Sequence, residues 1–177
     1  MSVINKQKLA KECGETCWLQ GEFKLRSGQI STDYFDKYRF ESLPHLLVPI
    51  ATLMAEKIEA IDDDFYALAG LELGGVPLAT AIGIQNGMPS LFVRKKAKQY
   101  GTCQFAEGLD FKGKKLIIIE DVVTTGGQII ESTRMLREAG AIVTHVICVL
   151  LRDKVGIDKL AAEGLTLDYV FSREDFE

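Results

Sequence analysis

The sequence predicts an α/β fold in which helices cover a central, mostly parallel sheet. Helical patterns alternate with short apolar runs from Leu46 onward. The run from Leu116 to Ile119 is apolar at every position, which is typical of a strand that is covered on both faces. A length of 177 residues with 47% hydrophobic and 26% charged content fits one globular domain.

The expected elements follow one another in a strand and helix rhythm. Helices are predicted at residues 46–60, 76–85, 127–139 and 155–163. Strands are predicted at residues 66–70, 90–94, 115–121, 142–151 and 167–171. In the third helix Ile129, Thr133 and Leu136 recur at helical spacing and predict its buried face.

Residues 1–41 do not fit this rhythm. They predict one amphipathic helix followed by short strands around residues 23–25 and 34–36. We expect a small N-terminal hood that packs over the ligand-binding edge of the sheet, with residues 42–177 as the core of the same domain. In open α/β sheets that edge lies at the carboxyl ends of the strands, so the hood is expected to close a site.

Composition excludes several classes of function. A net charge of -4 argues against a general binder of nucleic acids or anionic membranes. No apolar stretch approaches the roughly 20 residues of a membrane span, and the N-terminus has no signal-peptide core, so a cytoplasmic location is expected. The spacing of the cysteines fits neither a zinc site nor a redox CxxC motif, so all four (Cys13, Cys17, Cys103 and Cys148) are expected to be reduced thiols.

The strongest pattern lies where the apolar strand 116–119 ends. Two adjacent acids are followed by a threonine and glycine turn that opens a helix: Glu120, Asp121, Val122, Val123, Thr124, Thr125, Gly126, Gly127 and Gln128. Backbone N–H groups at a helix N-terminus bind phosphate, whereas the acids suit sugar hydroxyls or magnesium. The pattern indicates a ribose 5-phosphate ligand. The alternative is a plain strand-to-turn connection with two exposed acids.

Other phosphate motifs are absent, since neither GxxxxGK[ST] nor GxGxxG occurs. The segment from Glu120 to Gln128 resembles the phosphoribosyl pyrophosphate motif of the type I phosphoribosyltransferases. The resemblance implies the type I phosphoribosyltransferase fold and 5-phosphoribosyl 1-pyrophosphate (PRPP) as donor. It does not choose the acceptor base.

A cationic segment at residues 94–108 follows a predicted strand. Taken alone, its charges fit a solvated loop. Its start resembles the catalytic loop of orotate phosphoribosyltransferases, which has the pattern Arg-Lys-x-x-Lys-x-His-Gly. The resemblance implies that Lys98 is catalytic and reaches the neighbouring site of a homodimer, with the loop shared across the interface. It also implies that Arg94 and Lys95 bind the pyrophosphate, and that Tyr100 joins the PRPP site where the family often has histidine.

The segment from Phe23 to Asp36 is similar to the orotate-binding signature of the same family, Leu-x-Ser-Gly followed by serine and an aromatic pair. The resemblance implies that Tyr34 and Phe35 flank a pyrimidine and that Arg26 pairs with its carboxylate. Without the resemblance, Tyr34 and Phe35 fit core aromatics.

Two further places extend the resemblance. Gly74 and Gly75 lie in a segment that resembles the family's pyrophosphate loop, although some members have lysine at the position of Gly74. Backbone N–H groups are expected to bind pyrophosphate there, and a simple strand-to-helix turn is the alternative. Arg152 stands where the family has an arginine near the base, and Thr124 is expected to face the base as well.

The resemblance implies transfer of phosphoribosyl from PRPP to orotate, which gives orotidine 5-monophosphate in pyrimidine (UMP) biosynthesis. Glu120 and Asp121 are expected to hold the ribose, and Mg2+ is expected as a cofactor held mainly through the substrate, without a strong protein ligand. Arg26 and Arg152 favour a base with a carboxylate. The alternatives are a purine or uracil acceptor, or a PRPP-sensing regulator with little activity; neither nucleic acid nor membrane is expected as a partner.

Overall fold

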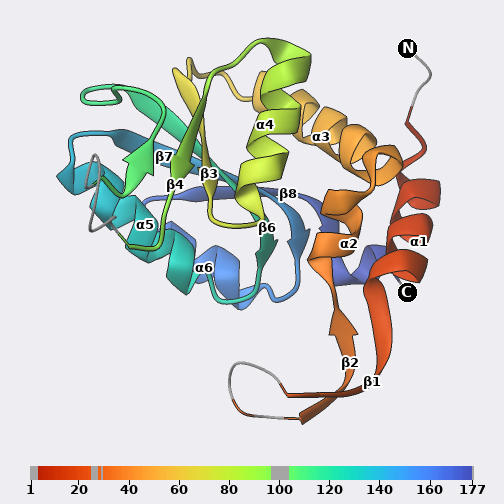
Figure 1. Ribbon diagram of the computed structural model, residues 1–177. Helices are drawn as coiled ribbons and strands as arrows, with labels where there is room; N and C mark the ends of the chain where they lie inside the picture. Colours follow the sequence, from red (N-terminus) through yellow and green to blue (C-terminus); the bar gives the residue numbers. More distant parts are fainter. Residues whose placement is uncertain (1–3, 25–27, 29, 97–103, 177) are drawn as a thin grey trace.

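The computed structural model describes residues 4–24, 28, 30–96 and 104–176, and these form a six-stranded sheet with helices around it and a two-stranded ribbon beside it (Figure 1). The helices are α1 (Lys6–Cys17), α2 (Lys37–Ser42), α3 (Pro44–Glu59), α4 (Gly75–Asn86), α5 (Gly127–Glu138), α6 (Val155–Ala162) and the 3-10 helix η1 (Arg173–Phe176). The strands are β1 (Trp18–Lys24), β2 (Ile30–Phe35), β3 (Ala67–Leu71), β4 (Ser90–Val93), β5 (Ala106–Glu107), β6 (Lys115–Val123), β7 (Ile142–Leu151) and β8 (Thr166–Ser172).

The sheet has the order β5-β4-β3-β6-β7-β8. Within the described part of this six-stranded sheet, β4 and β5 pair antiparallel and the other neighbours pair in parallel, which confirms the predicted mostly parallel sheet. The chain passes from β3 outward to β4 and from β6 outward to β7 in the opposite direction. Such a switch point leaves a crevice at the carboxyl ends of the strands, so the site is expected where β3 and β6 end.

Strand β6 lies between β3 and β7, and the side chains from Leu116 to Ile119 are fully buried. Ile117 and Ile119 pack on the face that α1, α3 and α4 cover. Leu116 and Ile118 pack on the opposite face with α5 and α6. The predicted central strand is therefore confirmed. Because side chains alternate along a strand, Glu120 and Asp121 must point to opposite faces.

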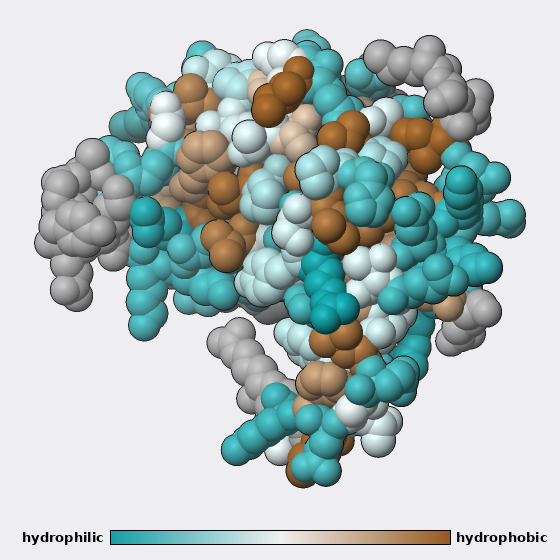
Figure 2. All heavy atoms as spheres, turned by 45° about the vertical axis from the view of Figure 1, so that its right-hand side comes forward, coloured by the Kyte–Doolittle hydropathy of each residue, from teal (hydrophilic) through white to brown (hydrophobic). Residues whose placement is uncertain are grey.

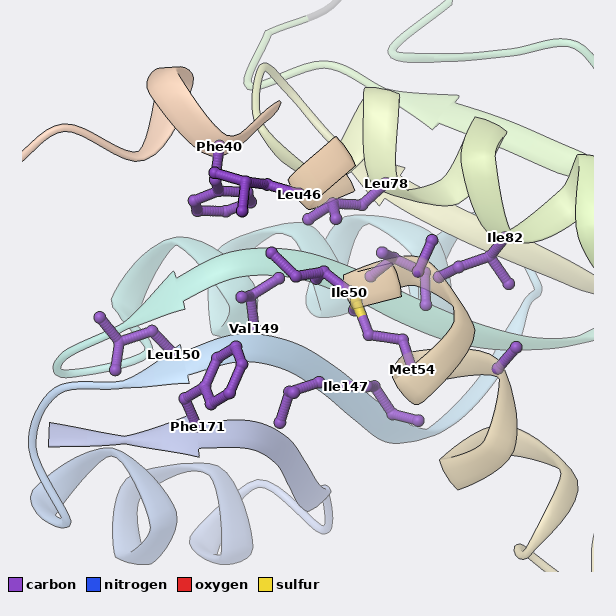
Figure 3. Packing of buried hydrophobic residues seen from close by; sticks show 14 of the residues in the cluster. Phe40, Leu46, Ile50, Met54, Leu78, Ile82, Ile147, Val149, Leu150 and Phe171 are labelled. Atoms are coloured by element: carbon purple, nitrogen blue, oxygen red, sulfur yellow. The ribbon is translucent and has the colours of Figure 1, made fainter. Parts of the chain in front are cut away.

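The core on the first face holds the hood in place. Helices α3 and α4 pack side by side on the sheet, α3 against β7 and β8 and α4 against β3 and β6 (Figure 3), through side chains that include Ile50, Met54, Leu78, Ile82, Ile147, Val149 and Phe171. Phe40 of α2 is fully buried and points toward Leu46 of α3 (Figure 3). The short helix α2 is thus anchored in the main core.

The N-terminal region contains the predicted helix and a strand pair, but the strands differ from the prediction. β1 and β2 pair antiparallel from Trp18 with Phe35 to Lys24 with Ile30, and the ribbon projects from the body of the molecule (Figure 1). Helix α2 and strand β5 were not expected. In the described chain no helix is long and apolar enough to cross a membrane. Cys13, Cys17 and Cys148 are buried free thiols.

Candidate active site

The loops that follow β3, β6 and β7 meet at one edge of the sheet. The N–H of Glu72, after β3, donates to the carbonyl of Val93 at the end of β4 over 2.8 Å. The N–H of Arg152, after β7, donates to the carbonyl of Val123 at the end of β6 over 2.8 Å. The predicted residues Gly74, Thr124 and Arg152 are therefore brought to the same edge.

The turn after β6 forms a cradle that leads into α5. Gly126 has a φ of 72°, a left-handed conformation that favours glycine, and a Cβ there would lie 3.1 Å from the side chain of Leu160. A pocket of about 390 Å³ is lined by Glu120, residues 122–129 and Glu131. Thr124, Thr125 and Gly127 are exposed, so hydroxyl and N–H groups are accessible at the start of a helix. This arrangement suits a phosphate.

A larger hollow of about 600 Å³ lies elsewhere, beside residues 104–112 and Ala139. It is lined by none of the predicted site residues that the structure describes, apart from the end of the 94–108 segment. The smaller pocket at the cradle is the candidate site, because its polar groups converge at a helix N-terminus.

The two acids of the motif lie on opposite faces, as the alternation of β6 requires. Glu120 lines the cradle pocket, and its Oε1 accepts a hydrogen bond from the N–H of Asp121 over 3.0 Å. Burial, and next the negative charge of Asp121, raise the pKa of Glu120 well above its usual value. Asp121 is 1% exposed and faces α2, and its Oδ1 accepts from the N–H of Val122 over 2.5 Å.

Two side chains of α2 surround Asp121, and the sequence did not single out either. The Nζ of Lys37 lies 2.5 Å from Oδ2 of Asp121. Burial opposes the charge on Lys37, but the carboxylates of Asp121 and Glu120 offset this and raise the pKa of Lys37. Glu41 is buried, and burial together with the charge of Asp121 raises the pKa of Glu41 to about 8.

The spacing of Lys37 and Glu41 is the sequence signal that could have found them. Residues four apart on a helix share a face, but a lysine and a glutamate at this spacing usually mark a solvated face. The spacing indicates a buried face only once Phe40 is known to anchor the helix in the core.

The predicted pyrophosphate loop is packed tightly between β3 and β6. A Cβ on Gly74 would lie 1.6 Å from Oδ2 of Asp121 and 2.6 Å from Oε1 of Glu41. A Cβ on Gly75 would lie 2.2 Å from the carbonyl oxygen of Ile119. Position 75 therefore requires glycine because a Cβ there would meet backbone, whereas a side chain at Gly74 would force the buried carboxylates of Asp121 and Glu41 to move. Both glycines are also buried, and the exposed residue of the loop is Leu73.

The first residues of the cationic loop are tied to neighbouring segments. The N–H of Arg94 donates to the carbonyl of Phe105 over 2.7 Å. The N–H of Lys95 donates to Oε1 of Glu72 over 2.7 Å, so the cationic loop begins beside the pyrophosphate loop. The predicted catalytic Lys98 and Tyr100 lie outside the described residues.

The residues predicted to contact the base are placed differently from one another. Tyr34 is 37% exposed, and its ring stacks on that of Phe23 with 5.4 Å between centroids. Phe35 is 4% exposed and packs in the hood core against the rings of Trp18, Phe40 and Phe176. Its predicted role beside a base is corrected to that of a core residue, because neighbouring rings already cover it.

The structure describes one of the two arginines of the predicted base site. Arg152 is half-buried and lines a hollow of about 460 Å³ between the ends of β7 and β8. Arg26 lies outside the described residues. The structure thus places one predicted carboxylate partner at the edge that holds the cradle.

Comparison with known proteins agrees with this geometry. Residues 39–172 match the family described as "Phosphoribosyl transferase domain". The orotate phosphoribosyltransferase of Nocardioides sp. is 47% identical over 169 residues, which cover 96% of this chain and 93% of that protein. The chain belongs to the orotate phosphoribosyltransferase family.

Solved structures of this family share the fold. The orotate phosphoribosyltransferase of Mycobacterium tuberculosis H37Rv in complex with Fe(III) dicitrate is 29% identical and superposes with a TM-score of 0.86, covering 98% of this chain and 99% of that one. The same enzyme in complex with PRPP is 27% identical and has a TM-score of 0.82, with coverage of 98% and 99%. Both alignments include the N-terminal hood as well as the orotate phosphoribosyltransferase core.

Proposed function

We propose that the chain transfers the phosphoribosyl group of PRPP to orotate, forming orotidine 5-monophosphate and pyrophosphate in de novo pyrimidine biosynthesis. The observation that carries the proposal is the pocket at the start of α5, where Glu120 stands beside exposed threonine and glycine groups. We further propose that residues 1–177 form one phosphoribosyltransferase domain, with residues 1–41 as its hood, and that it acts in the cytoplasm.

The 5-phosphate of the donor is assigned to the cradle. N–H groups from Thr124 to Gln128 and the threonine hydroxyls supply donors, and the positive end of the α5 dipole favours the dianion. The ribose then lies across the end of β6, between Glu120 on one face and Asp121 on the other. These acids accept hydrogen bonds from sugar hydroxyls and stabilise positive charge that develops at C1.

The reaction exchanges one bond at C1 for another. N1 of orotate forms its bond to C1 with loss of the N1 proton, while the C1–O bond breaks and its electron pair leaves with pyrophosphate. Negative charge grows on the leaving group, so Arg94, Lys95 and Lys98 are assigned to it, together with N–H groups of Gly74 and Gly75. Tyr100 is assigned to the same PRPP site.

Magnesium fits this site as part of the substrate complex. In the described part of the chain, no three His, Cys, Asp or Glu side chains converge as metal ligands, and Lys37 beside Asp121 would repel a second cation. We therefore propose that Mg2+ enters bound to PRPP oxygens rather than to protein carboxylates. When bound, it neutralises charge on the leaving pyrophosphate.

The base is assigned to the side of the cradle that Arg152 borders. Arg26 and Arg152 supply positive charge for a carboxylate, Tyr34 offers an exposed ring, and Thr124 borders both cradle and base. An acceptor with a carboxylate explains these cations better than uracil or a purine does.

We also propose a homodimer in which residues 94–108 of one protomer reach the site of the other. Exposed apolar side chains of α3, α4 and the loop before α4 support a protein contact there, since Val48 is 50%, Leu73 61% and Ile84 81% exposed. Figure 2, which brings the side of α1, α2 and α3 forward, shows apolar residues between hydrophilic ones on that face.

The proposal is tested by incubating the protein with PRPP, Mg2+ and one base at a time, and measuring pyrophosphate release. Release is expected with orotate and not with uracil or hypoxanthine. Release with uracil or hypoxanthine alone would overturn the acceptor assignment. If no base supports release while PRPP still binds, the chain is a PRPP-sensing protein rather than an enzyme.

A further inference from the structure

Helix α2 carries a lysine from the hood to the acid at the end of β6. Lys37 and Glu41 are four residues apart on this helix, so they share the face that lies against Asp121. The Nζ of Lys37 is 2.5 Å from Oδ2 of Asp121; the Lys37 side chain is 28% exposed, and that of Asp121 2%. Lys37 is thus the outer member of a mostly buried ion pair.

The charges around this pair do not balance without Lys37. Glu41, Glu120 and Asp121 are buried together, and Lys37 is the cation paired with them among the described residues. The other charged or titratable groups that act on this cluster are Asp36 and Tyr38 of α2 and the buried thiol of Cys148 on β7, and none of them adds positive charge. A buried carboxylate without a cation takes up a proton, because burial disfavours the charged form. Lys37 therefore supplies the positive charge that offsets these buried carboxylates.

Lys37 contacts one carboxylate of this cluster directly, that of Asp121. The Oδ1 of Asp121 accepts from the N–H of Val122 and its Oδ2 faces Lys37, so the carboxylate is held at both oxygens. Lys37 and Glu41 face Asp121, and Phe40, which lies between them in the sequence, is fully buried and anchors α2 in the core. On the opposite side, Gly74 leaves space for the carboxylate that any side chain at this position would fill.

We propose that Lys37 is a positioning residue for PRPP, acting through Asp121, whose carboxylate it holds in place at the end of β6 where the ribose binds. The inference rests on the proposed assignment of the ribose to Glu120 and Asp121. Each carboxylate oxygen has two lone pairs, so Asp121 accepts a sugar hydroxyl without releasing Val122 or Lys37. The hood thereby takes part in donor binding as well as covering the site.

The test compares Lys37→Met, which removes the charge at similar length, with Lys37→Arg, which keeps it. Lys11→Met is the matched control, because Lys11 also lies in the hood but its side chain is 77% exposed and pairs only loosely with Glu15 at 3.9 Å. PRPP binding with Mg2+ is measured by calorimetry without any base, and steady-state kinetics are measured with orotate. Thermal unfolding of each variant reports whether the fold is retained.

Lys37→Met should weaken PRPP binding and raise the KM for PRPP by about tenfold or more, with the KM for orotate within about twofold. Lys37→Arg should recover most of the loss, and Lys11→Met should match the wild type. Unchanged or tighter PRPP binding in Lys37→Met would overturn the proposal, as would equal losses in the Met and Arg variants with a large fall in melting temperature. If the wild type binds PRPP but does not use orotate, only the acceptor assignment fails. The ratio of the PRPP dissociation constants of Lys37→Met and the wild type then still decides the role of Lys37. A wild type that does not bind PRPP would overturn both.

Discussion

The backbone N–H of Lys95 donates a hydrogen bond to Oε1 of Glu72 over 2.7 Å. Glu72 in turn donates its own N–H to the carbonyl of Val93 over 2.8 Å. The loop before α4 and the first residues of the cationic segment therefore leave the sheet as a joined pair.

Replacing Glu72 with alanine should release the start of the cationic segment. One hydrogen bond of this kind contributes about 1 kcal/mol, so we expect a rise of about fivefold in the KM for PRPP. Glu72→Gln keeps the acceptor oxygen and should recover most of the affinity. Steady-state kinetics with PRPP as the varied substrate measure both. Equal KM values for the wild type and the alanine variant would contradict the anchoring role.

Gly74→Ala should disrupt the surroundings of Asp121, because the new Cβ would overlap its Oδ2 at 1.6 Å. We expect kcat/KM for PRPP to fall by about tenfold or more, equivalent to ~1.4 kcal/mol of transition-state stabilisation. Gly87→Ala is the control: Gly87 has a φ of 77° with nothing near its Cβ, so alanine there should lower stability but not affinity for PRPP. Equal effects of both variants on kcat/KM would show that the loss at Gly74 is one of stability alone.

The raised pKa of Glu41 makes stability depend on pH. Its pKa is about 8 in the folded protein against an ordinary 4.5, so between these values the folded state keeps a proton that the unfolded state has released. Stability from this group is complete below the lower value and is lost as the pH rises through the upper one. The free energy of unfolding of the wild type should therefore fall across this window.

Glu41→Gln removes the titration and should flatten that fall. The free energy of unfolding of the variant minus that of the wild type should be larger at pH ~8 than at pH ~5 by at least about 1 kcal/mol, since one pKa unit corresponds to ~1.4 kcal/mol. Denaturant unfolding at several pH values measures the difference. Glu56→Gln, on the exposed side of α3, should show no such gain. Parallel curves for Glu41→Gln and the wild type would refute the buried, protonated state of Glu41.

Sharing of the cationic loop can be tested by mixing two inactive variants. Lys98→Ala should reduce turnover by about a hundredfold or more while the fold is retained, and Glu120→Ala should do the same by damaging the cradle. If the loop acts across a dimer, mixing the two variants places an intact loop and an intact cradle in one of the two sites. Activity should then return to a sizeable fraction of the wild-type value after exchange of subunits. No recovery, with exchange demonstrated, would contradict a shared loop.

The sequence predicts the sheet and the cradle well because their signals are local. The run from Leu116 to Ile119 is apolar throughout, and it is the fully buried central strand. Glycine pairs mark the turns at Gly74 and Gly126, where close packing or a left-handed φ requires them. The element bounds differ from the predicted ones by at most two residues in the core from α3 to β8, apart from the unexpected β5.

The hood is where prediction from sequence is weakest. Helix α2 spans six residues, too few for an apolar period to appear, and β5 spans two. The contact of Lys37 with Asp121 joins residues far apart in the chain, so no local pattern reports it. A phenylalanine suits both a place beside a base and a place in the core, so the residue type of Phe35 does not decide between them. The rings packed around Phe35 assign it to the core.

The site at the end of β6 is proposed to join PRPP to orotate. The most direct measurement is a single reaction with PRPP, Mg2+ and equal concentrations of orotate, uracil and hypoxanthine, with the nucleotide product identified by mass spectrometry. We predict orotidine 5-monophosphate as the product, and its loss when Glu120 is replaced with alanine. Formation of a uracil or hypoxanthine nucleotide in its place, or of no nucleotide at all, would contradict the assignment.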